Sequence, residues 1–205
     1  MRTIPIAKSY FDGRELGLAG EDVAQPVAGL LVAVAGQGQI AGRIDSRFVG
    51  PSLNPLAEHM HYDPFFPAVA PAYTAAFLDY LHNELEFGRD EEYRVSAFDV
   101  KWDWKHKQPG TEDWFSPAPN TVPDLARALT MNPGLHVLVQ QGWYDLATPH
   151  FIMKHDLDHL RITPEARERI DVEYYEAGHM MYLHGPSMKK YRDDLARFIR
   201  ETDRL

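Results

Sequence analysis

The stretch 135–149, LHVLVQQGWYDLATP, starts as an apolar run and ends in a turn that contains Asp145. A second stretch, 170–180, IDVEYYEAGHM, has the same plan: β-branched and aromatic residues, then a glycine and His179. Short apolar runs bounded by turn residues are typical of buried strands. We therefore predict strands at 135–142 and 170–178, with Asp145 and His179 near their carboxyl ends.

Helical patterns flank and separate these two strands, at 124–132, 148–160, 163–170 and 187–205. The second and third of these begin with Thr-Pro, and Thr148 is the expected N-cap of the second. Strands that alternate with helices indicate a βαβ unit and hence a parallel sheet of the α/β class. Because parallel strands bring their carboxyl ends to one edge, we expect Asp145 and His179 to lie together there.

The upstream half of the chain has weaker patterns. Its predicted elements are a strand at 40–51, a Pro-rich loop at 53–71, a helix at 72–88 and a strand-like stretch at 93–104. Residues 105–123 contain four prolines, which indicates a long surface connection or a domain boundary.

The composition excludes several classes of protein. With 205 residues, 44% of them hydrophobic and 25% charged, the chain resembles an ordinary soluble globular protein. A net charge of −9 argues against a nucleic-acid partner. The longest apolar run, 27–36, is about half the roughly 20 residues that a membrane span needs, so no membrane association is expected. The absence of cysteine excludes disulfides and thiolate nucleophiles.

An aspartate followed by a histidine on the next strand is the order of the last two members of an α/β-hydrolase triad. In such a triad the aspartate holds the imidazole in one tautomer and stabilises the imidazolium formed during catalysis. Taken alone, an aspartate in this position is more often a turn former, and a histidine after a glycine is more often an ordinary loop residue. Both interpretations of Asp145 and His179 stay open on spacing alone.

Three motifs together resemble the closing segment of the serine carboxypeptidase family, particularly its bacterial branch: GWYDLATPHF (142–151), DHL (158–160) and YYEAGHMMYLH (174–184). The similarity continues upstream in GRIDSRFVGP (42–51), YTAAFLDYL (73–81) and WDW (102–104). It covers roughly residues 38–200.

This resemblance implies the C-terminal part of an α/β-hydrolase. Residues 1–123 would form a mainly helical lid region, and residues 124–205 the last part of the core. Asp145 and His179 match the family's acid and base, which implies hydrolysis of C-terminal residues from peptides at acid pH, without a cofactor. Family members commonly have Val-Pro after the residue that matches Met180, and the different sequence here leaves the chemistry of the pocket open.

The nucleophile of such a triad should stand in a G-x-S-x-G motif upstream of the other two members. The six serines are Ser9, Ser46, Ser52, Ser96, Ser116 and Ser187, and none has this context. We therefore expect that the chain alone hydrolyses no peptide at a meaningful rate. An upstream N-terminal segment or a complementing chain would supply the serine, and exposed sheet edges favour self-association.

The histidines and the tryptophans allow two further interpretations. His59 with His61, and His155 with His159, could be pairs of metal ligands, but no third ligand is evident and we predict no metal. The four tryptophans could line an aromatic binding surface or form the core of the lid: Trp102, Trp104, Trp114 and Trp143. A non-catalytic peptide-binding or interaction module therefore remains the alternative function. The cellular compartment is left open.

Overall fold

The computed structural model describes residues 38–54, 61–96, 105–110 and 120–203. Within these ranges the chain is a mixture of helices and short strands, and one of its sheets is parallel. This arrangement is compatible with the α/β class that the sequence predicts. The division of the chain near residue 123 stays a prediction.

The parallel sheet consists of β3 (Val137–Gly142) and β4 (Ile170–Tyr175). The two strands run in register from Val137 opposite Ile170 to Gly142 opposite Tyr175. The predicted parallel pair is thus confirmed, although β4 ends three residues before the predicted end at 178. Residues 176–179 form a turn instead.

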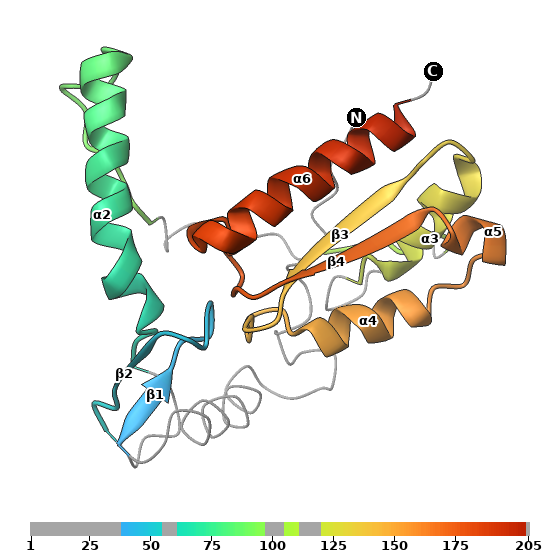
Figure 1. Ribbon diagram of the computed structural model, residues 1–205, viewed down its shortest axis with the longest axis horizontal. Helices are drawn as coiled ribbons and strands as arrows, with labels where there is room; N and C mark the ends of the chain where they lie inside the picture. Colours follow the sequence, from blue (N-terminus) through green and yellow to red (C-terminus); the bar gives the residue numbers. More distant parts are fainter. Residues whose placement is uncertain (1–37, 55–60, 97–104, 111–119, 204–205) are drawn as a thin grey trace.

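One face of this sheet is covered by α3 (Val122–Met131) and α4 (His150–Asp158), as Figure 1 shows. Leu125 and Leu129 of α3 and Leu157 of α4 form a buried cluster. Partly buried side chains of both strands, Val137, Val139, Ile170 and Val172, pack against that cluster. The alternation of side chains along a strand places these four residues on the same face.

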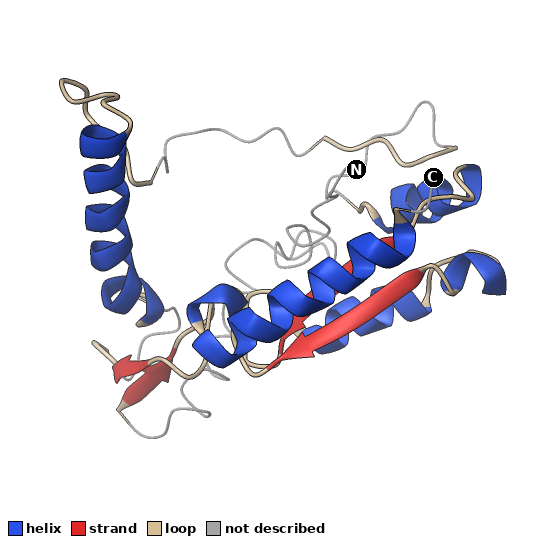
Figure 2. Cartoon of the chain, turned by 45° about the horizontal axis from the view of Figure 1, so that its top comes forward, coloured by secondary structure: helices blue, strands red, loops and turns tan. Residues whose placement is uncertain are grey.

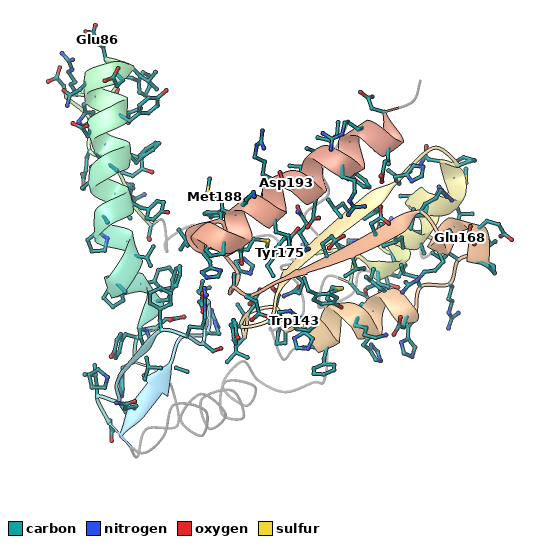
Figure 3. All side chains as sticks on the ribbon, viewed as in Figure 1. Glu86, Trp143, Glu168, Tyr175, Met188 and Asp193 are labelled. Carbon is teal, nitrogen blue, oxygen red and sulfur yellow. The ribbon has the colours of Figure 1, made fainter. Side chains whose placement is uncertain are left out.

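The opposite face is covered by α6 (Gly185–Thr202), which runs alongside both strands in Figure 2. Tyr175 is buried between α6 and the sheet (Figure 3), and its hydroxyl donates to Asp194 at 3.0 Å. Lys190 and Arg197 of α6 both bind the carboxylate of Glu173 on β4. This side of the sheet is therefore held by a polar network around one buried tyrosine.

Two short elements join these larger ones. The helix α5 (Pro164–Arg167) begins at the predicted Thr-Pro pair, and Thr163 is its N-cap, since the hydroxyl of Thr163 accepts from the amide of Ala166. The 3₁₀ turn η3 (Met181–Leu183) leads from the end of β4 into α6.

Upstream of the core, β1 (Gln39–Ala41) and β2 (Val49–Pro51) form a two-stranded antiparallel sheet. The prediction of one continuous strand over 40–51 is wrong. Residues 42–48, here called the hairpin loop, leave the strand pattern because the amide of Gly42 donates to the carbonyl of Phe48 and closes the loop.

Among the described upstream residues, the longest helix is α2 (Phe65–Asp79), which continues as the π-helical turn η2 (Tyr80–Glu84). It begins inside the stretch predicted to be a Pro-rich loop. Asp63 precedes the helix, and one of its carboxylate oxygens accepts from the amide of Phe65 at 2.9 Å. The other oxygen accepts from the amides of Arg43 and Ile44 in the hairpin loop, at 3.0 and 3.1 Å.

Both views show α2 projecting away from the sheet and α6 (Figures 1 and 2). Phe65 is its one buried residue, whereas Phe66, Tyr73 and Phe77 are exposed. Downstream of it, residues 93–96 form no strand, and the rest of the stretch predicted to be strand-like lies outside the described residues. Across the described ranges, none of the helices combines the length and the apolar character that crossing a membrane requires.

Candidate active site

The two predicted catalytic residues lie together beyond the carboxyl ends of β3 and β4. Oδ2 of Asp145 is 2.8 Å from Nδ1 of His179. The aspartate is buried, with 2% of its surface exposed, whereas the histidine side chain is 38% exposed. A buried carboxylate thus contacts one nitrogen of an imidazole that remains accessible from outside.

The carboxylate of Asp145 is held by four further donor contacts from its own turn and from β3. Its Oδ1 accepts from the amides of Ala147 and Thr148, at 2.8 and 2.9 Å. Its Oδ2 accepts from the hydroxyl of Thr148 at 2.7 Å and from the side-chain amide of Gln141 at 3.4 Å. A buried charge is tolerated only when such donors compensate for lost water, so this turn is built to keep a carboxylate in one place.

The surroundings of Asp145 determine the tautomer of His179. An ionised carboxylate has no proton to donate, so Nδ1 of His179 is the donor in their contact. In the neutral imidazole this makes Nε2 the unprotonated nitrogen, which is able to accept a proton. The pair therefore has the arrangement that a general base requires.

Backbone contacts join the two turns that carry the pair. The amide of Trp143 donates to the carbonyl of Tyr175, and the amide of Tyr144 donates to the carbonyl of Ala177, both at 3.0 Å. These bonds extend the pairing of β3 and β4 past the ends of the strands. The position of Asp145 relative to His179 is thus fixed by the backbone as well as by the side chains.

Sequence reasoning missed two residues that support Asp145. Gln141 appears only as part of a strand, and Thr148 is predicted to cap the following helix. The structure instead has Pro149 as the N-cap of α4, while the hydroxyl of Thr148 bonds to Asp145. An aspartate followed three residues later by threonine was the available signal, because such side chains commonly bond within a turn.

Ser187 and the histidine pair of α4, for which no metal is predicted, make their contacts away from Asp145 and His179. Ser187 is buried at the start of α6, where its Oγ lies 2.7 Å from Nδ1 of His184. The rings of His155 and His159 stack at 4.0 Å on α4, and the described part of the chain contains no group of three side chains suited to a metal ion. Ser9, Ser116 and His59 lie outside the described residues.

An aromatic group lies at the carboxyl ends of β3 and β4. Trp143, which directly follows β3, stacks on Tyr174 at a centroid distance of 4.3 Å. His150 packs edge-on against the same tryptophan, and Phe151 on α4 is exposed. Trp143 thus stands two residues before Asp145 in the chain, whereas Trp102, Trp104 and Trp114 lie outside the described residues.

Comparison with known proteins identifies no relative: no protein-family model, no curated protein and no solved structure matches the chain.

Proposed function

We propose that Asp145 and His179 are the acid and base of a serine-hydrolase triad in a serine carboxypeptidase-like peptidase with an α/β-hydrolase fold. The observation that carries this proposal is the 2.8 Å contact between Nδ1 of His179 and the buried carboxylate of Asp145. Its location beyond the carboxyl ends of two neighbouring parallel strands supports the same assignment. The resemblance of both turns to the family's motifs supplies the class of substrate, which is a peptide with a free carboxyl terminus.

In the proposed reaction, Nε2 of His179 takes the proton of a serine hydroxyl as the serine oxygen attacks the peptide carbonyl. The same nitrogen then gives this proton to the leaving amine. Asp145 stays ionised throughout and stabilises the imidazolium. The serine comes from an upstream segment or from a complementing chain, because none of the six serines in this sequence stands in a nucleophile elbow.

The test compares two preparations of the protein. One is the 205-residue chain produced alone, and the other is the tagged protein isolated from its natural source together with whatever polypeptide carries the serine. Both are assayed with an N-blocked dipeptide and with a fluorophosphonate that labels activated serines. We expect turnover and labelling in the natural preparation, and neither in the chain alone.

Variants connect this activity to the pair. His179→Ala should abolish both turnover and labelling in the natural preparation. His155→Ala is the matched control, since that imidazole is exposed on α4 and should leave both unchanged. A natural preparation that cleaves no peptide refutes the peptidase assignment. If the chain alone turns over the substrate and His179→Ala abolishes that turnover, the proposal that the serine comes from outside this chain is refuted.

A non-catalytic interaction module is the second candidate function. It is favoured by exposed aromatic side chains on α2, such as Phe66 and Tyr73, and by the exposed Trp143, which stacks on Tyr174. Exposed apolar surface of this kind is common at binding sites. This candidate predicts that the chain alone binds a peptide with a free carboxyl terminus and that His179→Ala binds it equally well.

A further inference from the structure

The hairpin loop is bonded to the turn that carries Asp145. The amide of Ser46 donates to the carbonyl of Tyr144 at 2.9 Å, and the amide of Leu146 donates to the carbonyl of Arg43 at 3.0 Å. These two bonds hold the residues immediately before and after Asp145. The hairpin loop, about one hundred positions upstream, therefore fixes the backbone on both sides of Asp145.

The same loop is bonded to the turn that carries His179. The amide of His179 donates to the carbonyl of Ile44 at 2.8 Å, and the amide of Gly178 donates to the carboxylate of Asp45 at 3.1 Å. A Cβ on Gly178 would lie only 2.4 Å from the Cβ of Asp45, so the turn and the loop are in direct contact. We call residues 176–179 the histidine turn. Two consecutive amides of this turn thus donate to two consecutive residues of the hairpin loop.

Asp45 is buried, and Arg47 holds it in place. Its carboxylate accepts from the backbone amide of Arg47 at 3.0 Å and from the guanidinium, with a shortest distance of 2.6 Å. Another nitrogen of this guanidinium donates to the carbonyl of Glu176 at 2.9 Å, which is also in the histidine turn. All these partners of Asp45 are hydrogen-bond donors, which is the environment that an ionised carboxylate needs.

We propose that Asp45, held by Arg47, is a positioning residue for His179: it fixes the turn at residues 178–179 and thereby the direction of the imidazole toward Asp145. This inference rests on the proposed function, because only a catalytic role gives that direction a purpose. The contacts that carry it are separate from those between His179 and Asp145. They come from a loop that belongs to neither β3 nor β4.

The test replaces Asp45 with asparagine, which has the same shape. Whichever way the new amide turns, its NH₂ group faces a neighbour that is itself a donor. We expect the amide of Gly178 to exchange with solvent about tenfold faster or more, as for loss of a hydrogen bond to a charged group. The Nδ1 proton of His179, which the bond to Asp145 shifts downfield in the NMR spectrum, should move upfield or disappear through exchange.

The matched control is Asp194→Asn, which removes a carboxylate bonded to Tyr175 and Lys190 between β4 and α6. It should lower the urea midpoint while leaving the Nδ1 proton of His179 in place. If Asp45→Asn does not fold, Arg47→Lys is measured instead. It removes the paired contacts of the guanidinium and should shift the same proton by a smaller amount.

The proposal is overturned if the Nδ1 proton of His179 keeps its position in Asp45→Asn, or in Arg47→Lys where that variant is used. It is also overturned if Asp194→Asn moves the proton as far as Asp45→Asn does. The measurement needs no substrate and no external serine. Failure of the peptidase assay therefore refutes the proposed function alone, whereas an unmoved proton refutes the role of Asp45 alone.

Discussion

A Cβ on Gly142 would lie 2.2 Å from the carbonyl oxygen of Gly178, so the end of β3 meets the turn that follows β4 at a distance that only glycine permits. The carbonyl oxygen of Ala177 is nearly as close, at 2.3 Å. Both neighbours are backbone atoms, which cannot rotate out of the way as a flexible side chain can. The close approach brings the turn of Asp145 beside the turn of His179.

Gly142→Ala should therefore destabilise the protein by about 1–3 kcal/mol, because the added methyl group forces the backbone of the two turns apart. The free energy of unfolding in urea measures this change. Gly134→Ala is the control, since a Cβ at Gly134 meets no atom within 4 Å. Equal stability of the two variants would contradict the tight backbone contact.

Thr148→Val should lower the free energy of unfolding by about 1–3 kcal/mol, because the hydroxyl of Thr148 donates to the buried carboxylate of Asp145 at 2.7 Å. Valine has nearly the same shape, so the change mainly removes the hydrogen bond. Thr130→Val provides the comparison: that hydroxyl also makes a bond, to the carbonyl of Ala126, but on an exposed position of α3. The expectation is wrong if both variants lose the same stability in urea.

Leu129→Ala should cost about 2–5 kcal/mol, since the side chain is fully buried between α3 and the sheet and its removal leaves a cavity. Met131→Ala, on the same helix but 68% exposed, should change the unfolding free energy little. Thermal or urea unfolding distinguishes the two. If Leu129→Ala lowers the free energy of unfolding only slightly, the cluster of Leu125, Leu129 and Leu157 is not the core that stabilises the parallel sheet and its helices.

Stability at alkaline pH should depend on Tyr175. Burial, assisted by the bond to Asp194 and opposed by the bond from Gln140, raises the pKa of its hydroxyl above the ordinary 10.0. The pKa of Tyr175 is higher in the folded state than in the unfolded state. Its contribution to the free energy of unfolding is therefore fully present below the unfolded-state pKa and is lost as the pH rises from there toward the folded-state pKa.

We therefore expect the unfolding free energy to fall less steeply between about pH 9 and about pH 11 in Tyr175→Phe than in the wild type. The variant should also be less stable at neutral pH, because it loses two hydrogen bonds. Tyr93→Phe removes an exposed tyrosine outside this network and should keep the wild-type slope. Parallel slopes for all three proteins would contradict the expectation.

The downstream half of the chain was predictable because its signals are local. Apolar runs ended by Gly142 and Gly178 correctly predicted two parallel strands, and the Thr-Pro pair at 163–164 correctly predicted the start of a helix. The proximity of Asp145 and His179 then follows from the geometry of parallel strands. These inferences need no knowledge of distant contacts.

The upstream half was harder to predict because distant contacts override its local patterns. Residues 40–51 alternate like a strand, but Asp45 bonds to Gly178, which lies 133 positions away, and this contact belongs to a loop. The prolines at 67 and 71 predicted a loop, yet α2 includes both. Pro67 lies in the first turn, where amides have no partner within the helix, and only Pro71 removes a hydrogen bond. Because this helix is largely exposed, water is able to bind the carbonyl that Pro71 leaves without its amide.

Asp63 connects α2 to the hairpin loop, and through that loop to the turn that carries His179. One of its carboxylate oxygens is bonded to the first turn of α2, and the other to the amides of Arg43 and Ile44. The carbonyl of Ile44 in turn accepts from the amide of His179. Tilting α2 about its base would therefore strain a continuous series of hydrogen bonds that ends at the backbone amide of His179. A movement at the exposed end of α2 would thus be transmitted through Asp63 and Ile44 to the backbone of His179.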